Sequence, residues 1–423
     1  MLPQLVTEIP GPKSRALAEQ LRRHESRNVT FLADDWPVFW KRAEGTNVWD
    51  EDGNRFLDLT SAFGVASLGH TNAGVRDALV SQAGGLMHAM GDVHPTAVKA
   101  ALCTRLSALT FERWGCGAGK TILGNSGFEA VEAALKTSLL HSGKPGVIAF
   151  TGGYHGLGFG AVAATGLPFF REPFRAQLKE FATFLPFPCD AAEIENVIAR
   201  GGIGCILVEP VQGRGGCVVP SREFLPMLRA ICDAHKILLI ADEIYTGFNR
   251  TGALFACEHS SVVPDIVCVG KALTGGFPLS ACIGRADAMD AWPASAGEAL
   301  HTSTFLGNPL GCAMALASLE QHADPQIAAH VLERGAKLKA ALQSLGIGNA
   351  RGLGLMLGVE LVKANGEPDG ERAISIVKNA LRFGLLLLAD GPAGNVLSFA
   401  PPFGIADAEI AFVAEQVAHA ASA

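Results

Sequence analysis

The sequence predicts an α/β fold with a mainly parallel sheet, covered by helices on both faces, and a second, smaller α+β domain. Several short segments are continuously apolar, and stretches with a helical spacing of apolar residues separate them. Strands that are buried on both faces, as in a helix-covered parallel sheet, have this continuous apolar pattern. The 423 residues exceed the size of one ordinary core, so we expect two domains, or one large domain with a satellite.

The expected elements follow each other along the chain. The segment NVWDEDGNRFLDL, at 47–59, places an Asp-Gly turn between two short strands, which is typical of a hairpin. Helical spacing predicts helices at 127–140 and 221–235. Apolar strands are predicted at 121–125, 146–150, 205–210, 237–244 and 265–270. In the C-terminal third, helices mix with short strands, which indicates the α+β domain.

Composition and charge argue against several classes of function. The chain has 41 acidic and 34 basic side chains, a net charge of -7, which disfavours a nucleic-acid or membrane-surface role. The ten cysteines contain no CxxC pair, so we expect no metal site and small core thiols in a reducing compartment. The apolar runs are too short to span a bilayer, and no signal peptide is visible. We therefore expect a cytoplasmic protein.

Two glycine-rich segments do not meet the requirements of nucleotide-binding loops. GCGAGKT, at 115–121, follows Trp114 where a Walker A loop needs its first glycine. Its strand also follows the lysine instead of preceding it. RGLGLMLG, at 351–358, comes before a strand and is equally weak as a dinucleotide fingerprint.

Two turns carry polar residues directly after predicted strands. In GNSGFEAVEAAL, Ser126 and Gly127 precede a helix whose free N–H groups and dipole favour a phosphate. An ordinary capping box of Ser126 with Glu129 explains the same turn. Asp242 ends a very apolar strand, where a carboxylate needs a cationic partner or good donors. That partner is either an arginine such as Arg250 or a protonated ring nitrogen.

Lys271 and Tyr154 follow two further strands. Lys271 comes 271 − 242 = 29 residues after Asp242, so neighbouring parallel strands would present amine and acid at one edge. Taken alone, a strand-end lysine such as Lys271 is usually solvated, and Tyr154, in TGGYHG, can be an ordinary turn residue. Together, a phosphate cradle, a buried acid, an aromatic plate and a lysine suit pyridoxal phosphate (PLP). The lysine would form its Schiff base and the acid would hold its ring nitrogen.

The chain resembles the class III PLP-dependent aminotransferases, which include ornithine, 4-aminobutyrate and ω-amine transaminases. The resemblance rests on four motifs in order, ILVEPVQGRGG, ADEIYTGFNRTG, VCVGKALTGG and TFLGNPLGCAMA, and runs from about Val48 to the C-terminus. It implies PLP fold type I, with residues 61–309 forming a large domain around a sheet of the seven-stranded type. Residues 1–60 and 310–423 would form the small domain. It also implies a homodimer or tetramer with shared active sites.

The resemblance further implies an aminotransferase that moves an amino group from an amine or amino acid to an oxo acid, ketone or aldehyde by a ping-pong mechanism. An aminomutase or racemase of the same fold is the alternative, whereas a non-catalytic binding module would need neither the lysine nor the acid. The implied residues are Lys271 for the Schiff base, Asp242 for the ring nitrogen, Ser126 and Gly127 for the phosphate, Tyr154 for stacking, and Thr304, lent to the neighbouring subunit's phosphate.

The substrate end of the site departs from the family pattern. The arginine that grips α-carboxylates in many members corresponds to Ser398, and the glutamate that can pair with it corresponds to Arg214. We expect Arg214 to bind a substrate carboxylate, to pair with an acid, or to point to solvent. Phe63 is a second candidate substrate contact. Phe128 stands near the phosphate turn, where the family commonly has a small polar or aliphatic residue.

Overall fold

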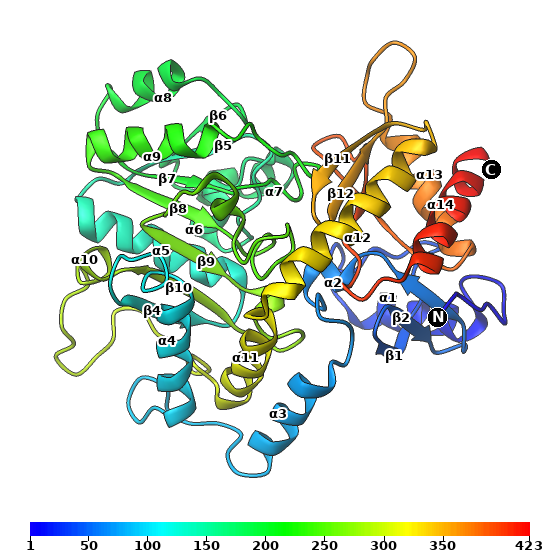
Figure 1. Cartoon of the computed structure of the whole chain (residues 1–423), viewed down its shortest axis with the longest axis horizontal. Coiled ribbons are helices and arrows are strands. Elements are labelled where there is room, and N and C mark those ends of the chain that lie inside the picture. Colours follow the sequence, from blue (N-terminus) through cyan, green and yellow to red (C-terminus); the bar gives the residue numbers. More distant parts are fainter. The chain divides into compact units, whose positions relative to one another are not determined.

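The computed structural model describes residues 1–423 and divides into two compact units (Figure 1). One unit contains Met1–Asn72 and His330–Ala423, and the other contains Ala73–Ala329. Both chain ends therefore belong to one unit, and the middle of the chain forms the other. The domain boundaries expected after residues 60 and 309 stay a prediction.

A seven-stranded sheet forms the middle of the 73–329 unit. Its strands are β4 (Gly119–Gly124), β5 (Gly146–Phe150), β6 (Ala182–Leu185), β7 (Ile203–Val208), β8 (Leu238–Asp242), β9 (Ile266–Val269) and β10 (Ser280–Arg285). Their order is β4-β10-β9-β8-β7-β5-β6. β10 lies antiparallel between β4 and β9, and the remaining pairs are parallel. The predicted mainly parallel sheet is confirmed, although β6 and β10 were not expected.

Helices from this unit contribute to two apolar clusters, one with α4, α8, α9 and α11 and one with α5, α6 and α10. The helices are α3 (Ala73–Ala83), α4 (Ala97–Leu109), α5 (Gly127–Ser142), α6 (Phe159–Ala164), α7 (Pro168–Arg171), α8 (Ala191–Ile198), α9 (Phe224–His235), α10 (Ala286–Met289) and α11 (Pro309–His322).

Residues of one strand alternate between these clusters, as β9 illustrates. Val267 and Val269 belong to the first cluster, whereas Ile266 and Cys268 belong to the second. Successive side chains of a strand point to opposite faces, so a strand covered on both faces is apolar at every position. This packing explains the continuous apolar segments of the sequence.

The unit formed by both chain ends is α+β. Its two four-stranded sheets have the orders β1-β2-β3-β13 and β11-β12-β15-β14. β2 and β3 form the predicted hairpin, and β13 from the C-terminal part pairs parallel with β3. The strands are β1 (Trp40–Glu44), β2 (Asn47–Asp50), β3 (Arg55–Asp58), β11 (Asn349–Leu353), β12 (Met356–Glu360), β13 (Leu385–Leu386), β14 (Leu388–Asp390) and β15 (Val396–Phe399). The helices are α1 (Pro12–His24), α2 (Ser61–Gly64), α13 (Gly370–Arg382) and α14 (Asp407–Ser422), while α12 (Pro325–Ser344) begins in the other unit.

The ten cysteines are all free thiols, and most are buried as expected. Cys116 is the correction, because it is exposed in the turn between α4 and β4. None of the helices combines the length and apolar character that a membrane crossing requires.

Candidate active site

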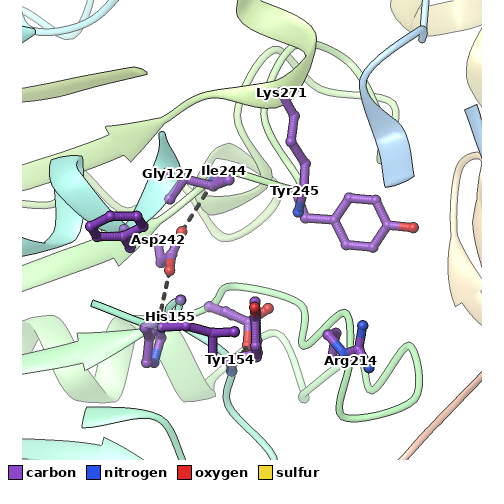
Figure 2. Close-up of a pocket in the computed structure, with 12 residues that line it drawn as sticks. Gly127, Tyr154, His155, Arg214, Asp242, Ile244, Tyr245 and Lys271 are labelled. Carbon is purple, nitrogen blue, oxygen red and sulfur yellow. Dashed lines mark hydrogen bonds and ion pairs between the residues drawn. The ribbon is translucent and has the colours of Figure 1, made fainter. Parts of the chain in front are cut away.

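One pocket of the 73–329 unit brings most of the expected site residues together (Figure 2). It lies beyond the carboxyl ends of β5, β7, β8 and β9, which is where parallel sheets bind their ligands. Its volume is about 370 Å³, within the range of small-molecule sites. The residues that line it include Gly127, Tyr154, Arg214, Asp242 and Lys271.

Asp242, the last residue of β8, is buried in the pocket wall with 4% of its surface exposed. One carboxylate oxygen lies 2.7 Å from His155 Nδ1, and the other accepts the Ile244 N–H at 3.2 Å. Arg250 is therefore not its partner. Burial alone lowers the pKa of His155, but the hydrogen bond and the negative charges of Asp242 and Glu209 outweigh burial and raise it.

Lys271 follows β9 and lines the same pocket. β8 and β9 are adjacent and parallel, as the spacing of Asp242 and Lys271 predicts. The Lys271 backbone has φ +44°, an uncommon conformation for a residue with a side chain. Its Nζ lies 4.2 Å from the centre of the Tyr245 ring, a cation–π distance. The side chain thus contacts the pocket wall instead of extending into bulk solvent.

The turn before α5 has the properties of an anion site. The Glu129 carboxylate accepts the Ser126 N–H at 3.2 Å, as in a capping box. The Ser126 hydroxyl oxygen, however, is buried without a hydrogen-bond partner. A Cβ on Gly127 would lie only 2.9 Å from the Ile244 side chain, so a larger residue would crowd the pocket. A phosphate at this helix N-terminus would satisfy the hydroxyl.

Tyr154 and Arg214 lie on neighbouring loops that follow β5 and β7. The Arg214 guanidinium carbon lies 5.4 Å from the centre of the Tyr154 ring and 5.5 Å from that of Phe170. Arginine stacks readily on aromatic faces. Burial raises the pKa of the Tyr154 hydroxyl, and the Arg214 charge opposes the rise. Phe128 also lines the pocket and packs against Gly156.

Several residues discussed from the sequence are not among those that line this pocket: Ser126, which directly precedes Gly127, and Thr304, Phe63 and Ser398. Thr304 is exposed in the segment before α11, next to Ser303, which accepts a hydrogen bond from the Asn125 side chain at 3.2 Å. Phe63 belongs to the other unit, where it is 59% exposed in a turn of positive φ values. Ser398 is buried in β15 of that unit.

The sequence interpretation missed three polar residues of the pocket wall: His155, Glu209 and Tyr245. Glu209 follows β7 directly and is 7% exposed. An acid at the end of an apolar strand is the signal that identified Asp242, so the same signal could have found Glu209. His155 stands beside Tyr154 between glycines of the TGGYHG loop. No pattern in the sequence pointed to Tyr245.

The residues present fit PLP. An amine and a buried carboxylate face one pocket, and an unpaired buried hydroxyl lies at the N-terminus of a long helix beside it. The fold and this site together define a PLP-dependent enzyme with a mainly parallel sheet. The sequence profile of the aminotransferase class-III family matches residues 31–421. The chain belongs to this family.

Individual relatives agree with this assignment. The chain is 37% identical to a 4-aminobutyrate aminotransferase of Mycobacterium leprae, over 96% of this chain and 94% of that protein. It is 37% identical to an acetylornithine aminotransferase of Xanthomonas campestris, over 88% of this chain and 90% of that protein. A PLP-bound amine transaminase from an uncultivated Pseudomonas species superposes with a TM-score of 0.86 at 28% identity, covering 94% and 98% of the two chains.

Nothing in these comparisons favours an aminomutase or a racemase. The protein is a PLP-dependent aminotransferase that takes a small-molecule amine and a carbonyl compound as substrates.

Proposed function

We propose that Lys271 and Asp242 are the catalytic residues of this aminotransferase, and that Ser126, Gly127 and Tyr154 help to hold the cofactor. The observation that carries the proposal is the convergence of Lys271 and Asp242 in one pocket, from the ends of the adjacent strands β9 and β8. When bound, PLP supplies an electron sink for the bond between the substrate's amine-bearing carbon and its hydrogen.

Each side chain then has a physical task. The Ser126 hydroxyl and the N–H groups of the α5 start bind the phosphate. Asp242 places a negative charge where the ring nitrogen keeps its proton, and His155 fixes the orientation of that carboxylate. With the cofactor bound, Lys271 would hold it through its side-chain amine, and the same amine would serve to carry a proton between the substrate carbon and the cofactor. Tyr154 supplies an aromatic face for the ring.

The substrate class follows from Arg214. We infer that the amine donor carries a carboxylate distant from its amine, and that Arg214 binds this carboxylate. An arginine binds a carboxylate through two parallel hydrogen bonds, and Arg214 stands on the pocket wall close to Tyr154. The substrates named for the two curated relatives, 4-aminobutyrate and acetylornithine, both carry a carboxylate and an amine.

A matched pair of donors tests this role. 4-Aminobutyrate and butylamine present the same amine, but only the first has a carboxylate. Each is added without acceptor, and loss of the cofactor's visible absorption is followed. We expect Arg214→Ala to lower kcat/KM for 4-aminobutyrate by roughly 10- to 100-fold and for butylamine by less than about 3-fold. Arg214→Lys, which keeps the charge, should lie between. Equal losses for both donors would reject the role.

We further propose a homodimer in which Thr304 binds the cofactor phosphate of the partner subunit. Thr304 is exposed, and large apolar side chains are exposed nearby, including Phe305 at 58% and Met87 at 63%. Asn308 donates a hydrogen bond to the Met87 carbonyl at 3.3 Å, which ties the two segments together. Such an exposed apolar surface is typical of a protein contact.

Mixed subunits test the exchange of Thr304. Thr304→Ala and Lys271→Ala chains with different tags are expressed alone as controls and co-expressed, and the mixed dimer is purified through both tags. If Thr304 serves the partner's site, a mixed dimer has one intact site and one doubly altered site. Activity of the mixed species should then recover to a large fraction of one wild-type site. A mixed species as inactive as its parents would show that Thr304 acts within its own chain.

A further inference from the structure

Glu209 is a buried acid in the pocket with no role in the mechanism above. It directly follows β7, and its two carboxylate oxygens bind different loops. Oε1 accepts the Tyr154 N–H at 2.8 Å, and Oε2 accepts the Gly213 N–H at 3.0 Å. One side chain therefore holds the loop after β5 and the loop after β7.

These two loops carry two neighbouring parts of the site. The first presents the Tyr154 ring, and the second presents Arg214, the residue directly after Gly213. The guanidinium of Arg214 rests 5.4 Å from the centre of the Tyr154 ring. A shift of either loop would change the position of that cation relative to the ring.

We propose that Glu209 is a positioning residue that fixes Arg214 relative to Tyr154, and so couples cofactor binding to the selection of carboxylated donors. The proposal rests on the carboxylate-binding role proposed for Arg214. Glu209 touches neither the amine nor the carboxylate of the donor in this account; it acts through the two loops.

A purely structural link between the loops already exists. The Gln212 side chain donates a hydrogen bond to the Thr151 carbonyl at 2.9 Å, outside the pocket lining. A buried acid that faces the pocket would be an unfavourable second link between the loops, because burying a carboxylate costs free energy. Burial raises the pKa of Glu209 to about 7, with Asp242 adding to the rise while His155 and the two N–H groups oppose it. The presence of an acid here fits a positional role better than a simple loop clamp.

A matched control stands on the neighbouring strand end. Glu243 is also buried, with none of its surface exposed, and its oxygens accept the Ala256 and Cys257 N–H groups at 2.9 and 2.8 Å. It does not line the pocket. In Glu209→Gln and Glu243→Gln, the amide oxygen can accept one N–H, but the amide nitrogen cannot accept the other. Each substitution thus breaks one backbone link at nearly constant volume.

The experiment compares the two variants in two measurements. The first is the PLP dissociation constant of the protein freed of cofactor. The second is the ratio of kcat/KM for 4-aminobutyrate to that for butylamine. We expect Glu209→Gln to raise the dissociation constant and lower the ratio by about tenfold each, and Glu243→Gln to change each by less than about threefold.

A double variant separates positioning from direct contact. In a protein that already carries Arg214→Ala, adding Glu209→Gln should leave the ratio unchanged, because Glu209 acts on it through Arg214. The PLP dissociation constant should still rise. Glu209→Asp keeps the charge but shortens the reach, and it should show the same two changes if Glu209→Gln does not fold.

Two results would overturn the proposal: a Glu209→Gln protein that matches Glu243→Gln in both measurements, or a further fall of the ratio in the double variant. If Arg214 does not bind the donor carboxylate, the result is different. Arg214→Ala alone would then leave the ratio of kcat/KM for 4-aminobutyrate to that for butylamine unchanged.

Discussion

A buried aspartate lies at each end of the parallel strands in the seven-stranded sheet, one at their amino ends and one at their carboxyl ends. The partners of the two carboxylates differ. At the amino edge, just before β9, Asp265 is 2% exposed and pairs with Arg229 at 2.7 Å and Arg285 at 2.8 Å. At the carboxyl edge, Asp242 is 4% exposed, and its side-chain partner is His155. The positive charges of two arginines compensate the Asp265 carboxylate within the protein. The Asp242 carboxylate faces a pocket instead.

This difference shows that a buried carboxylate is not in itself the mark of a functional site. A buried charge needs compensation, and two arginines provide it for Asp265. Asp242 has no arginine partner, so a cationic group in the pocket can supply part of its compensation. The same substitution should therefore have opposite consequences at the two edges.

The largest expected effect comes from Asp→Asn at each edge. Asp242→Asn should lower kcat by roughly 10³-fold, since the amide cannot hold a positive charge on the ring nitrogen. Its free energy of unfolding should change little. Asp265→Asn removes the buried carboxylate between Arg229 and Arg285, which keep only their more exposed partners Asp233 and Asp287, and should cost about 3 kcal/mol of stability. Urea titrations and steady-state kinetics measure both quantities.

A folded Asp265→Asn protein that lost as much activity as Asp242→Asn would contradict the proposed difference between the two aspartates. An Asp242→Asn protein that lost as much stability as Asp265→Asn would contradict it as well.

A smaller loss of kcat is expected when His155, the side chain that contacts the Asp242 carboxylate, is replaced. His155→Asn removes the ring that holds one oxygen of that carboxylate. We expect kcat to fall by about 10- to 100-fold, less than in Asp242→Asn, because the acid remains but is poorly oriented. The pH at which the bound cofactor changes its absorption should shift as well. Wild-type values for both quantities would mean that Asp242 needs no partner.

The smallest expected effect concerns stability and pH. Burial raises the pKa of Glu209 to about 7 from an ordinary value of 4.5, so the folded protein binds a proton that the unfolded chain releases between these values. The stabilisation of the folded protein that comes from this proton is present below pH 4.5 and is lost as the pH rises through 7. Between about pH 5 and 8, the unfolding free energy of cofactor-free wild type should fall by on the order of 1–3 kcal/mol more than that of Glu209→Gln.

Urea titrations of both proteins at the two pH values measure this difference. Parallel pH profiles for wild type and Glu209→Gln would place the titration on another buried group, such as His155.

The sequence predicts those parts of the fold that depend on local pattern. Continuous apolar segments located β5, β7, β8 and β9, and the ends of these strands located Asp242 and Lys271. The reason is physical, because burial on both faces leaves a signal in every residue of a strand. The position of a residue at the end of such a strand then fixes the edge on which it lies.

Other parts depend on contacts between distant residues and leave no local signal. The antiparallel insertion of β10 between β4 and β9 is a matter of strand order, which spacing along the chain does not encode. The link from Glu209 to the Tyr154 amide joins residues 55 positions apart. The packing of the Lys271 amine on the Tyr245 ring depends on the turn after β9, where Lys271 has a positive φ.

Covalent mapping of the cofactor identifies the lysine that binds it. The protein is incubated with PLP, reduced with borohydride, digested and analysed by mass spectrometry. The account predicts one modified peptide, which contains Lys271, and none in Lys271→Ala, while peptides with the exposed Lys236 stay unmodified. Stoichiometric labelling of a different lysine in the wild type, or undiminished labelling of Lys271→Ala, would contradict it.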